Sequence, residues 1–274
     1  CSKVYYYLGK EVSDMDLILG KESIGKLFVK YSIPSVIAMV VFSVYIVVDG
    51  IFVGNVIGSK GLSAVNIAMP FFGVAMAIGI MVAIGGGTIT SIELGKGDKS
   101  AARKTFSLAF YTLIIITLTL SVFTVIFAPT IAKILGANKE LVPLVVEYLV
   151  SLCLFLATFV GSSYLSSGLR VMGKPNHAMV ADIISSILNI VLDYIFIVKI
   201  GLGLAGAGLA SGIAFTIGFL FALSQYLKKD SILKFCKIKF DFKKIIRIFY
   251  NGSSEGITQF AVAFSTYIFN IVLM

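Results

Sequence analysis

Three polar residues lie inside long apolar stretches of this chain: Asp49, Asn189 and Asp193. A carboxylate at the middle of a lipid bilayer costs roughly 2.5–3.5 kcal/mol, so such residues are rare in membrane helices and usually mark the path of an ion or a substrate. Asn189 and Asp193 are four residues apart and therefore share one face of a helix. Carboxylate and amide oxygens suit a small cation, and two buried carboxyl groups side by side also hold a proton more tightly. The pattern predicts a site for Na⁺ or H⁺.

Such a site needs membrane helices to position it, and the composition predicts them. The chain has 274 residues, of which 58% are hydrophobic and 14% charged, with a mean hydropathy of +0.99. A soluble domain is about half apolar and about a quarter charged. Apolar spans are expected at 31–53, 62–93, 105–131, 141–168, 176–198 and 204–227, and a seventh begins near 248. These spans are too long for barrel strands, so the predicted class is an all-α, polytopic membrane protein.

The distribution of basic residues predicts how the chain is oriented in the membrane. Nineteen of the 23 lysines and arginines fall in the N-terminal segment, in the loops after the second and fourth spans, and after the sixth span. The remaining loops carry only Lys60, Lys133, Lys139 and Lys199. The positive-inside rule therefore predicts a cytoplasmic N-terminus. The net charge of +9 then reflects topology and contact with anionic membrane lipids, and no nucleic-acid partner is expected.

This topology brings the polar residues to a similar depth. Asp49 lies near the outer end of the first span, and Asn189 and Asp193 lie in the outer half of the fifth. Ser211, in the outer half of the sixth span, adds a hydroxyl group. We expect these four side chains to meet in one pocket. The alternative is that Asp49 or Asp193 only reaches the outer membrane interface.

Three further features could affect function. Pro34, early in the first span, predicts a kink because proline removes a backbone hydrogen bond from a helix. Glu255, in the first turns of the seventh span, is a candidate for a second site, with capping of the helix start as the alternative. The glycine triplet 85–87 is expected to interrupt the second span.

The sequence divides into four segments. They are a lead-in (1–22), a six-helix transmembrane bundle (23–228), a cytoplasmic basic linker (229–247) and the first helix of a further bundle (248–274). The linker has the pattern of an amphipathic segment on the inner membrane face, and a solvated linker is the alternative. The pattern Phe-Ser-x-Tyr-Ile occurs at 42–46 and again at 264–268. This repeat predicts two six-helix bundles, the second cut off in its first helix.

Catalytic motifs are not evident in the sequence. Residues 201–206 match Gly-x-Gly-x-x-Gly, but they follow a membrane helix rather than a strand, and no acidic residue lies about 20 positions further on. We expect a tight outer turn there. Cys1, Cys153 and Cys236 are far apart, and His177 has no evident partner for metal binding or catalysis. The protein is therefore not expected to be an enzyme, and no cofactor is expected beyond the coupling ion.

At these residues the chain resembles the MATE (multidrug and toxic compound extrusion) family of cation-coupled antiporters. The similar stretches are the first span with Pro34 and Asp49, the loop 169–175, and residues 189–208, where Asn-Ile-Val-Leu-Asp-Tyr-Ile-Phe leads into the glycine-rich turn. The resemblance covers about residues 17–274. It implies the N-terminal six-helix lobe of a twelve-helix MATE/MOP-type transporter and the start of the second lobe, truncated in helix 7.

The resemblance also implies an activity and a site. Proteins of this family export drugs and organic cations in exchange for Na⁺ or H⁺, by a rocker-switch form of alternating access. The family's cation site carries over to Asp49, Asn189 and Asp193, which could bind Na⁺, and less directly to Ser211, where threonine is more usual. Pro34 matches the proline at which the family's first helix bends. A multi-pass plasma-membrane protein, monomeric at full length, is implied.

Two other functions are alternatives. A flippase for lipid-linked saccharides, from the same superfamily, tends to have a cationic central cavity, whereas the charges within the membrane here are acidic. An intramembrane aspartyl protease would use Asp49 and Asp193 as a pair that shares one proton. The neighbouring Asn189 and the absence of a Gly-x-Gly-Asp context disfavour the protease.

Overall fold

The computed structural model describes residues 23–228 and 231–273, and every regular element in those ranges is a helix. The elements in order are α2 (Ile24–Val56), α3 (Ser59–Gly95), α4 (Lys99–Ile134), α5 (Val142–Cys153), α6 (Leu156–Val171), α7 (Pro175–Asp193), the π-helix η1 (Tyr194–Lys199), α8 (Gly203–Leu227) and α9 (Phe242–Leu273). The predicted lead-in, 1–22, lies outside the described residues. The all-α prediction is confirmed.

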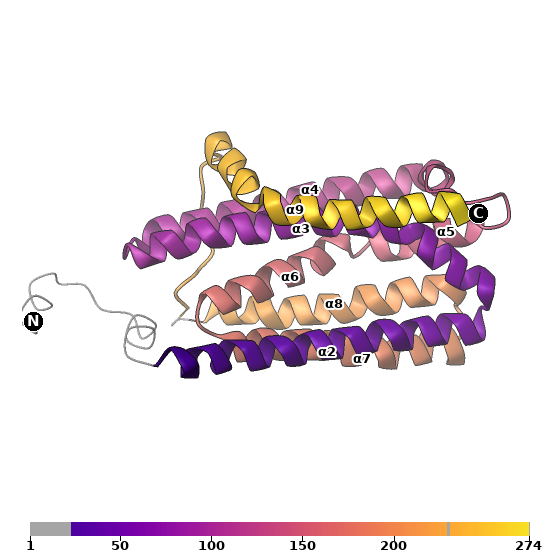
Figure 1. The fold of residues 1–274 in the computed structure, drawn as a ribbon, viewed down its shortest axis with the longest axis horizontal. Coiled ribbons are helices and arrows are strands. Elements are labelled where there is room, and N and C mark those ends of the chain that lie inside the picture. The colour runs from indigo at the N-terminus through magenta and orange to yellow at the C-terminus, as the bar shows by residue number, and fades with distance from the viewer. Residues whose placement is uncertain (1–22, 229–230, 274) are drawn as a thin grey trace, which may run out of the picture.

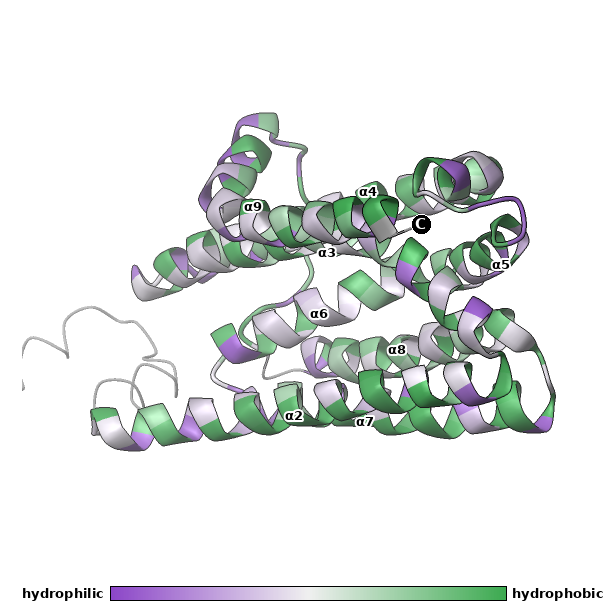
Figure 2. Ribbon diagram, turned by 45° about the vertical axis from the view of Figure 1, so that its right-hand side comes forward, coloured by the Kyte–Doolittle hydropathy of each residue, from purple (hydrophilic) through white to green (hydrophobic). Residues whose placement is uncertain are grey.

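Six predicted spans can be recognised in this order. Five helical segments are long and apolar enough to cross a membrane: α2, α3, α4, α7 with η1, and α8. The sixth is the pair α5 and α6, whose axes differ by 51°. Many large apolar side chains on the outside of these helices are exposed, as a lipid-facing surface requires. Figure 2 shows this apolar colouring along α2 and α7, with hydrophilic residues concentrated near the helix ends.

The fourth predicted span is not one straight helix. It breaks between Cys153 and Leu156, where Phe155 has a non-helical backbone. The Phe155 ring fills the space that a side chain would occupy at Gly212 of α8. The carbonyl of Cys153 accepts a hydrogen bond from the Ser121 hydroxyl of α4, so the break leaves that group satisfied inside the protein. The apolar pattern is continuous across this point and gave no sign of the break.

The helices run side by side along one long axis (Figure 1). α2 packs on α7, α7 on α8, and α8 on both α5 and α6. α6 in turn contacts α3, and α3 also packs against α4 and α9. The start of α2, the α3–α4 and α6–α7 turns and residues 231–241 all lie near one end of the bundle (Figure 1). These are the segments whose basic residues predict an inner location, and we call this the inner end.

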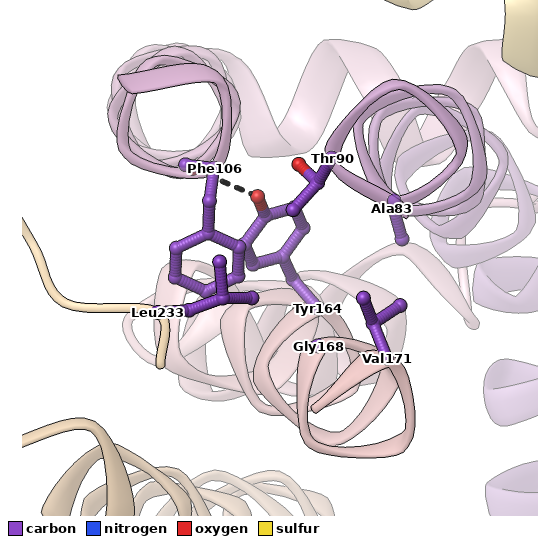
Figure 3. Close-up of a pocket in the computed structure, with 8 residues that line it drawn as sticks. Ala83, Thr90, Phe106, Tyr164, Gly168, Val171 and Leu233 are labelled. Carbon is purple, nitrogen blue, oxygen red and sulfur yellow. Dashed lines mark hydrogen bonds between the residues drawn. The ribbon is translucent and has the colours of Figure 1, made fainter. Parts of the chain in front are cut away.

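The segment after α8 begins inside the bundle, so its residues 231–236 neither lie on a membrane surface nor extend into solvent. Leu233 is fully buried and closes a small cavity beside Phe106 and Tyr164 (Figure 3). The Arg103 guanidinium donates a hydrogen bond of 2.8 Å to the backbone oxygen of Ile232. Phe235 packs against Phe106, with 5.5 Å between ring centroids. The two sequence-based alternatives for the linker are therefore wrong for residues 231–236.

α9 begins at Phe242, before the start predicted near residue 248, and lies along α3. α3 is helical through residues 85–87, so the predicted interruption there is wrong. A Cβ at Gly85 would collide with the backbone of Ile248, and a Cβ at Gly252 would collide with the backbone of Met81. These glycines let the two helix backbones touch, as small residues do between membrane helices.

We predict that Gly85→Ala destabilises the protein by about 1–3 kcal/mol, because the added methyl group forces α3 and α9 apart. Gly95→Ala, on the same helix, is the control, since a Cβ there meets no atom within 4 Å. Thermal unfolding in detergent would measure both variants. Equal melting temperatures for the two would contradict the close contact between α3 and α9.

Candidate functional site

The packing of α2 against α7, and of α7 against α8, brings the predicted polar residues together. Asn189 and Asp193 on α7 are fully buried, and Ser211 on α8 is 7% exposed. The Asn189 side-chain amide donates a hydrogen bond of 2.9 Å to the Ser211 hydroxyl. The Asp49 carboxyl of α2 lies close enough to the Asp193 carboxyl for the two groups to interact electrostatically. The cluster therefore joins three helices.

Asp49 lies on the only face of α2 that the bundle covers. The buried residues of α2 are Pro34, Ala38, Tyr45 and Val53. Asp49 lies between Tyr45 and Val53 at spacings of four residues, so it belongs to the same stripe. Its Oδ1 atom is buried, although part of the residue is accessible. The alternative in which Asp49 only reaches the outer interface does not fit this geometry.

Several oxygens of the cluster lack hydrogen-bond partners. Among the described residues, no donor reaches Asp49 Oδ1, Asn189 Oδ1 or either carboxylate oxygen of Asp193. A buried polar atom without a partner costs about 1–3 kcal/mol, and more when it is charged. Two ionised carboxylates can only accept hydrogen bonds, so their contact becomes a hydrogen bond only when one carries a proton. A bound proton or cation would satisfy these oxygens, and the residues present therefore fit either ion.

Two tyrosines that sequence reasoning missed lie beside the acidic pair. Tyr45 of α2 and Tyr148 of α5 are buried, and each is close enough to interact electrostatically with both Asp49 and Asp193. Tyr45 is one helical turn before Asp49, a spacing that could have identified it. Tyr148 arrives from another helix, and nothing in the sequence indicated it. The two phenol groups add polar side chains beside the acidic pair.

α7 changes to a π-helix at the residue after Asp193. The η1 segment runs from Tyr194 to Lys199, and single-turn π segments often occur at functional sites. The predicted outer turn follows, where Gly201 and Gly203 have φ of 77° and 58°, a region that favours glycine. At the start of α8, the Glu147 carboxylate accepts a hydrogen bond of 2.9 Å from the backbone N–H of Ala205. These features fix the ends of α7 and α8 that lie opposite the inner end of the bundle.

Two other candidate residues lie away from the cluster. Pro34 is buried in α2, fifteen residues before Asp49, which is about 22 Å along a helix. α2 is helical through Pro34, and the neighbouring Ser35 hydroxyl donates a hydrogen bond of 2.9 Å to the Tyr31 carbonyl. Glu255 is exposed on α9, well inside that helix. A role for Glu255 in capping the helix start is therefore wrong, because α9 begins at Phe242.

The part of the chain that contains this cluster also matches known proteins. The MatE family model matches residues 34–195, which include Pro34, Asp49, Asn189 and Asp193. The multidrug export protein MepA of Staphylococcus haemolyticus is 30% identical over 215 residues, which are 78% of this chain and 48% of that protein. The chain thus spans about half the length of the curated relatives it matches.

Two solved structures have the same fold over most of the chain. A crystal structure of MATE in the straight conformation has a TM-score of 0.82 and 26% identity, covering 90% of this chain and 56% of that one. A crystal structure of MATE in the bent conformation has a TM-score of 0.77 and 27% identity, covering 86% and 53%. The helical bundle is thus that of a multi-pass membrane protein. Since the family model also covers more than half of its residues, the chain belongs to the MatE family.

Proposed function

We propose that the protein exports drugs and organic cations in exchange for Na⁺ or H⁺, and that Asp49, Asn189, Asp193 and Ser211 bind the coupling ion. The observation that carries this proposal is the group of buried oxygens without partners on α2 and α7. Oxygens left in this state are stabilised by a cation or a proton and by little else available in a membrane. The relative MepA, named a multidrug export protein, supports the class of substrate.

The same cluster suits either coupling ion. A proton would lie between the Asp49 and Asp193 carboxyls, with one acting as donor and the other as acceptor. Na⁺ would instead be coordinated by the carboxylate oxygens together with Oδ1 of Asn189. Ser211 would orient the amide in both cases, because its hydroxyl accepts from Asn189 Nδ2 and leaves the unpartnered Oδ1 available to the ion.

Ion binding would change how tightly α2 is held. α2 contacts the bundle through one narrow stripe that includes Tyr45 and Val53, and Asp49, which lies in the same stripe, is the one acidic residue of α2. Neutralising the acidic pair removes a repulsion between α2 and α7, while an empty, doubly ionised site favours separation. Pro34, which lacks a backbone N–H, gives α2 a point at which to bend. Movement of α2 would then alter the drug cavity as the two lobes rock between inward- and outward-facing states.

The charge of the pocket favours cationic substrates over lipid-linked saccharides, whose anionic groups an acidic site repels. The same acidic pair is better suited to ion coupling than to peptide cleavage, since Asn189 fills part of the space between helices. The basic inner end supports a cytoplasmic N-terminus in the cell membrane. We propose a monomer as the transporting unit of the full-length protein.

We predict that Asp49→Asn and Asp193→Asn in the full-length protein each reduce ion-coupled efflux by roughly tenfold or more, because a charged contact to the ion is lost. Dye efflux from proteoliposomes, driven by a Na⁺ or a pH gradient, would measure the effect. Glu140→Gln is the matched control, since Glu140 is exposed and pairs with Lys60 rather than with a residue of the cluster. Wild-type coupling in both aspartate variants would rule out this site.

We predict that Ser211→Ala raises the ion concentration needed for half-maximal efflux by roughly fivefold or more, because it leaves the buried Asn189 amide without its acceptor. Ser211→Thr keeps the hydroxyl and should behave nearly as the wild type. Ser186→Ala is the control, since that hydroxyl bonds only to the backbone of its own helix, at Asp182. If all three variants had the same ion dependence, Ser211 would have no part in ion binding.

A further inference from the structure

The first turns of α9 run at an angle to the rest of that helix. Figure 1 shows them running across the long axis, level with the inner ends of α6 and α8, before α9 turns to lie along α3. The sequence Asn251-Gly252-Ser253-Ser254 lies in this part of the helix, and Gly–Ser pairs are common at helix bends. The Ser253 hydroxyl donates a hydrogen bond of 2.8 Å to the Tyr250 carbonyl. Such bonds from serine to the helix backbone often bend a helix.

This part of α9 presents an apolar stripe that the described protein does not cover. Phe242, Ile246 and Tyr250 are 65%, 53% and 78% exposed, and they follow one another at spacings of four residues. The opposite face is buried against the bundle, with Ile245 at 7% and Ile248 at 1% exposure. The exposed stripe is therefore a separate surface and not the edge of the protein core.

A basic stripe runs beside the apolar one. Lys243 and Arg247, one turn apart on α9, are exposed, and so is Lys239, which lies just before the helix. Protein–protein interfaces are depleted in lysine at their centre, whereas a helix that lies on a membrane has basic residues flanking aromatic and aliphatic ones. The pairing of these two stripes at the inner end fits an anionic lipid surface better than it fits a protein partner.

Three contacts fix the orientation of this surface. The Lys244 ammonium lies 3.0 Å from the Glu93 carboxylate at the inner end of α3, and both side chains are largely shielded from solvent. Thr105 of α4 donates a hydrogen bond to the same carboxylate. At the start of the helix, Asp241 accepts a hydrogen bond of 3.1 Å from the backbone N–H of Lys244. The exposed stripes are thus held facing outward from the bundle.

We propose that residues 239–250 form a membrane-surface anchor that lies in the plane of the inner leaflet and binds anionic lipid headgroups. Phe242, Ile246 and Tyr250 enter the region between headgroups and acyl chains, and the basic stripe contacts the headgroups. The Glu93–Lys244 pair then joins this anchor to α3. The proposal does not depend on ion coupling or on the exported substrate.

Residues 1–274 contain no tryptophan, so a single introduced one reports on its own surroundings once any tryptophan in the rest of the full-length protein is replaced by phenylalanine. Tyr250→Trp would be prepared in the full-length protein and reconstituted in vesicles of phosphatidylcholine and phosphatidylglycerol. One of the two lipids, at the same mole fraction in each case, would carry bromine atoms that quench tryptophan fluorescence. Phe242→Trp provides a second position on the same stripe. Quenching by brominated phosphatidylglycerol should exceed quenching by brominated phosphatidylcholine by about twofold or more.

Charge variants decide whether the basic stripe causes the preference. Replacing Lys239, Lys243 and Arg247 by glutamine in the Tyr250→Trp background should bring the two quenching values together. The matched control replaces Lys96, Lys99 and Lys104, at the α3–α4 turn, and should leave the preference unchanged. Equal quenching by both lipids in the unaltered stripe would overturn the proposal, and so would an equal loss of preference in both triple variants. Absence of quenching by either lipid would show that protein covers this surface, which would also overturn it.

Discussion

Burial of negatively charged oxygens without partners is the constraint on which the arrangement of α2, α7 and α8 depends. Asp193 is fully inside the protein, yet none of the described donors reaches its carboxylate. In a soluble protein a water molecule could donate a hydrogen bond to such a carboxylate, but few other donors are present at membrane depth. A pocket of this kind is costly to maintain, and binding of a small ion removes much of that cost. Its presence within an apolar bundle supports the proposed function, in which the ion binds and is released.

The contrast between α2 and α3 shows where movement is easiest. α3 is buried along much of its length, and at Gly85 its backbone touches that of α9. α2 is buried along a single stripe, which includes Tyr45 and Val53, and most of its large apolar residues are exposed. A change of charge at Asp49 acts on this weakly held helix. The tightly packed pair of α3 and α9 resists the same displacement, because two helices in direct backbone contact must first move apart before one can slide along the other.

The sequence predicted those features of the structure that depend on a single helix or on the membrane topology. Apolar length located the spans, and the four-residue spacing of Asn189 and Asp193 placed both on one buried face. Charge distribution was enough to bring Asp49 and Ser211 to the same depth. These are properties of single helices and of topology, which local sequence encodes directly.

Features that depend on contacts between distant segments were not predictable in this way. The break at Phe155 follows from the space above Gly212 on another helix, and Tyr148 enters the site by way of that broken span. Leu233 looked like part of an exposed linker because its burial requires partners from α4 and α6. The glycines near Gly85 looked like a helix interruption because their true partner is α9, more than 150 residues away.

Infrared difference spectroscopy of the full-length protein in lipid tests the shared acidic site most directly. A proton held between Asp49 and Asp193 gives a carbonyl-stretch band of a protonated carboxyl group in a dry environment. That band should disappear when pH is raised or Na⁺ is added, and it should be altered in both Asp49→Asn and Asp193→Asn. A spectrum in which neither pH nor Na⁺ changes any carboxyl band, or in which the band survives unchanged in both variants, would contradict a shared ion site.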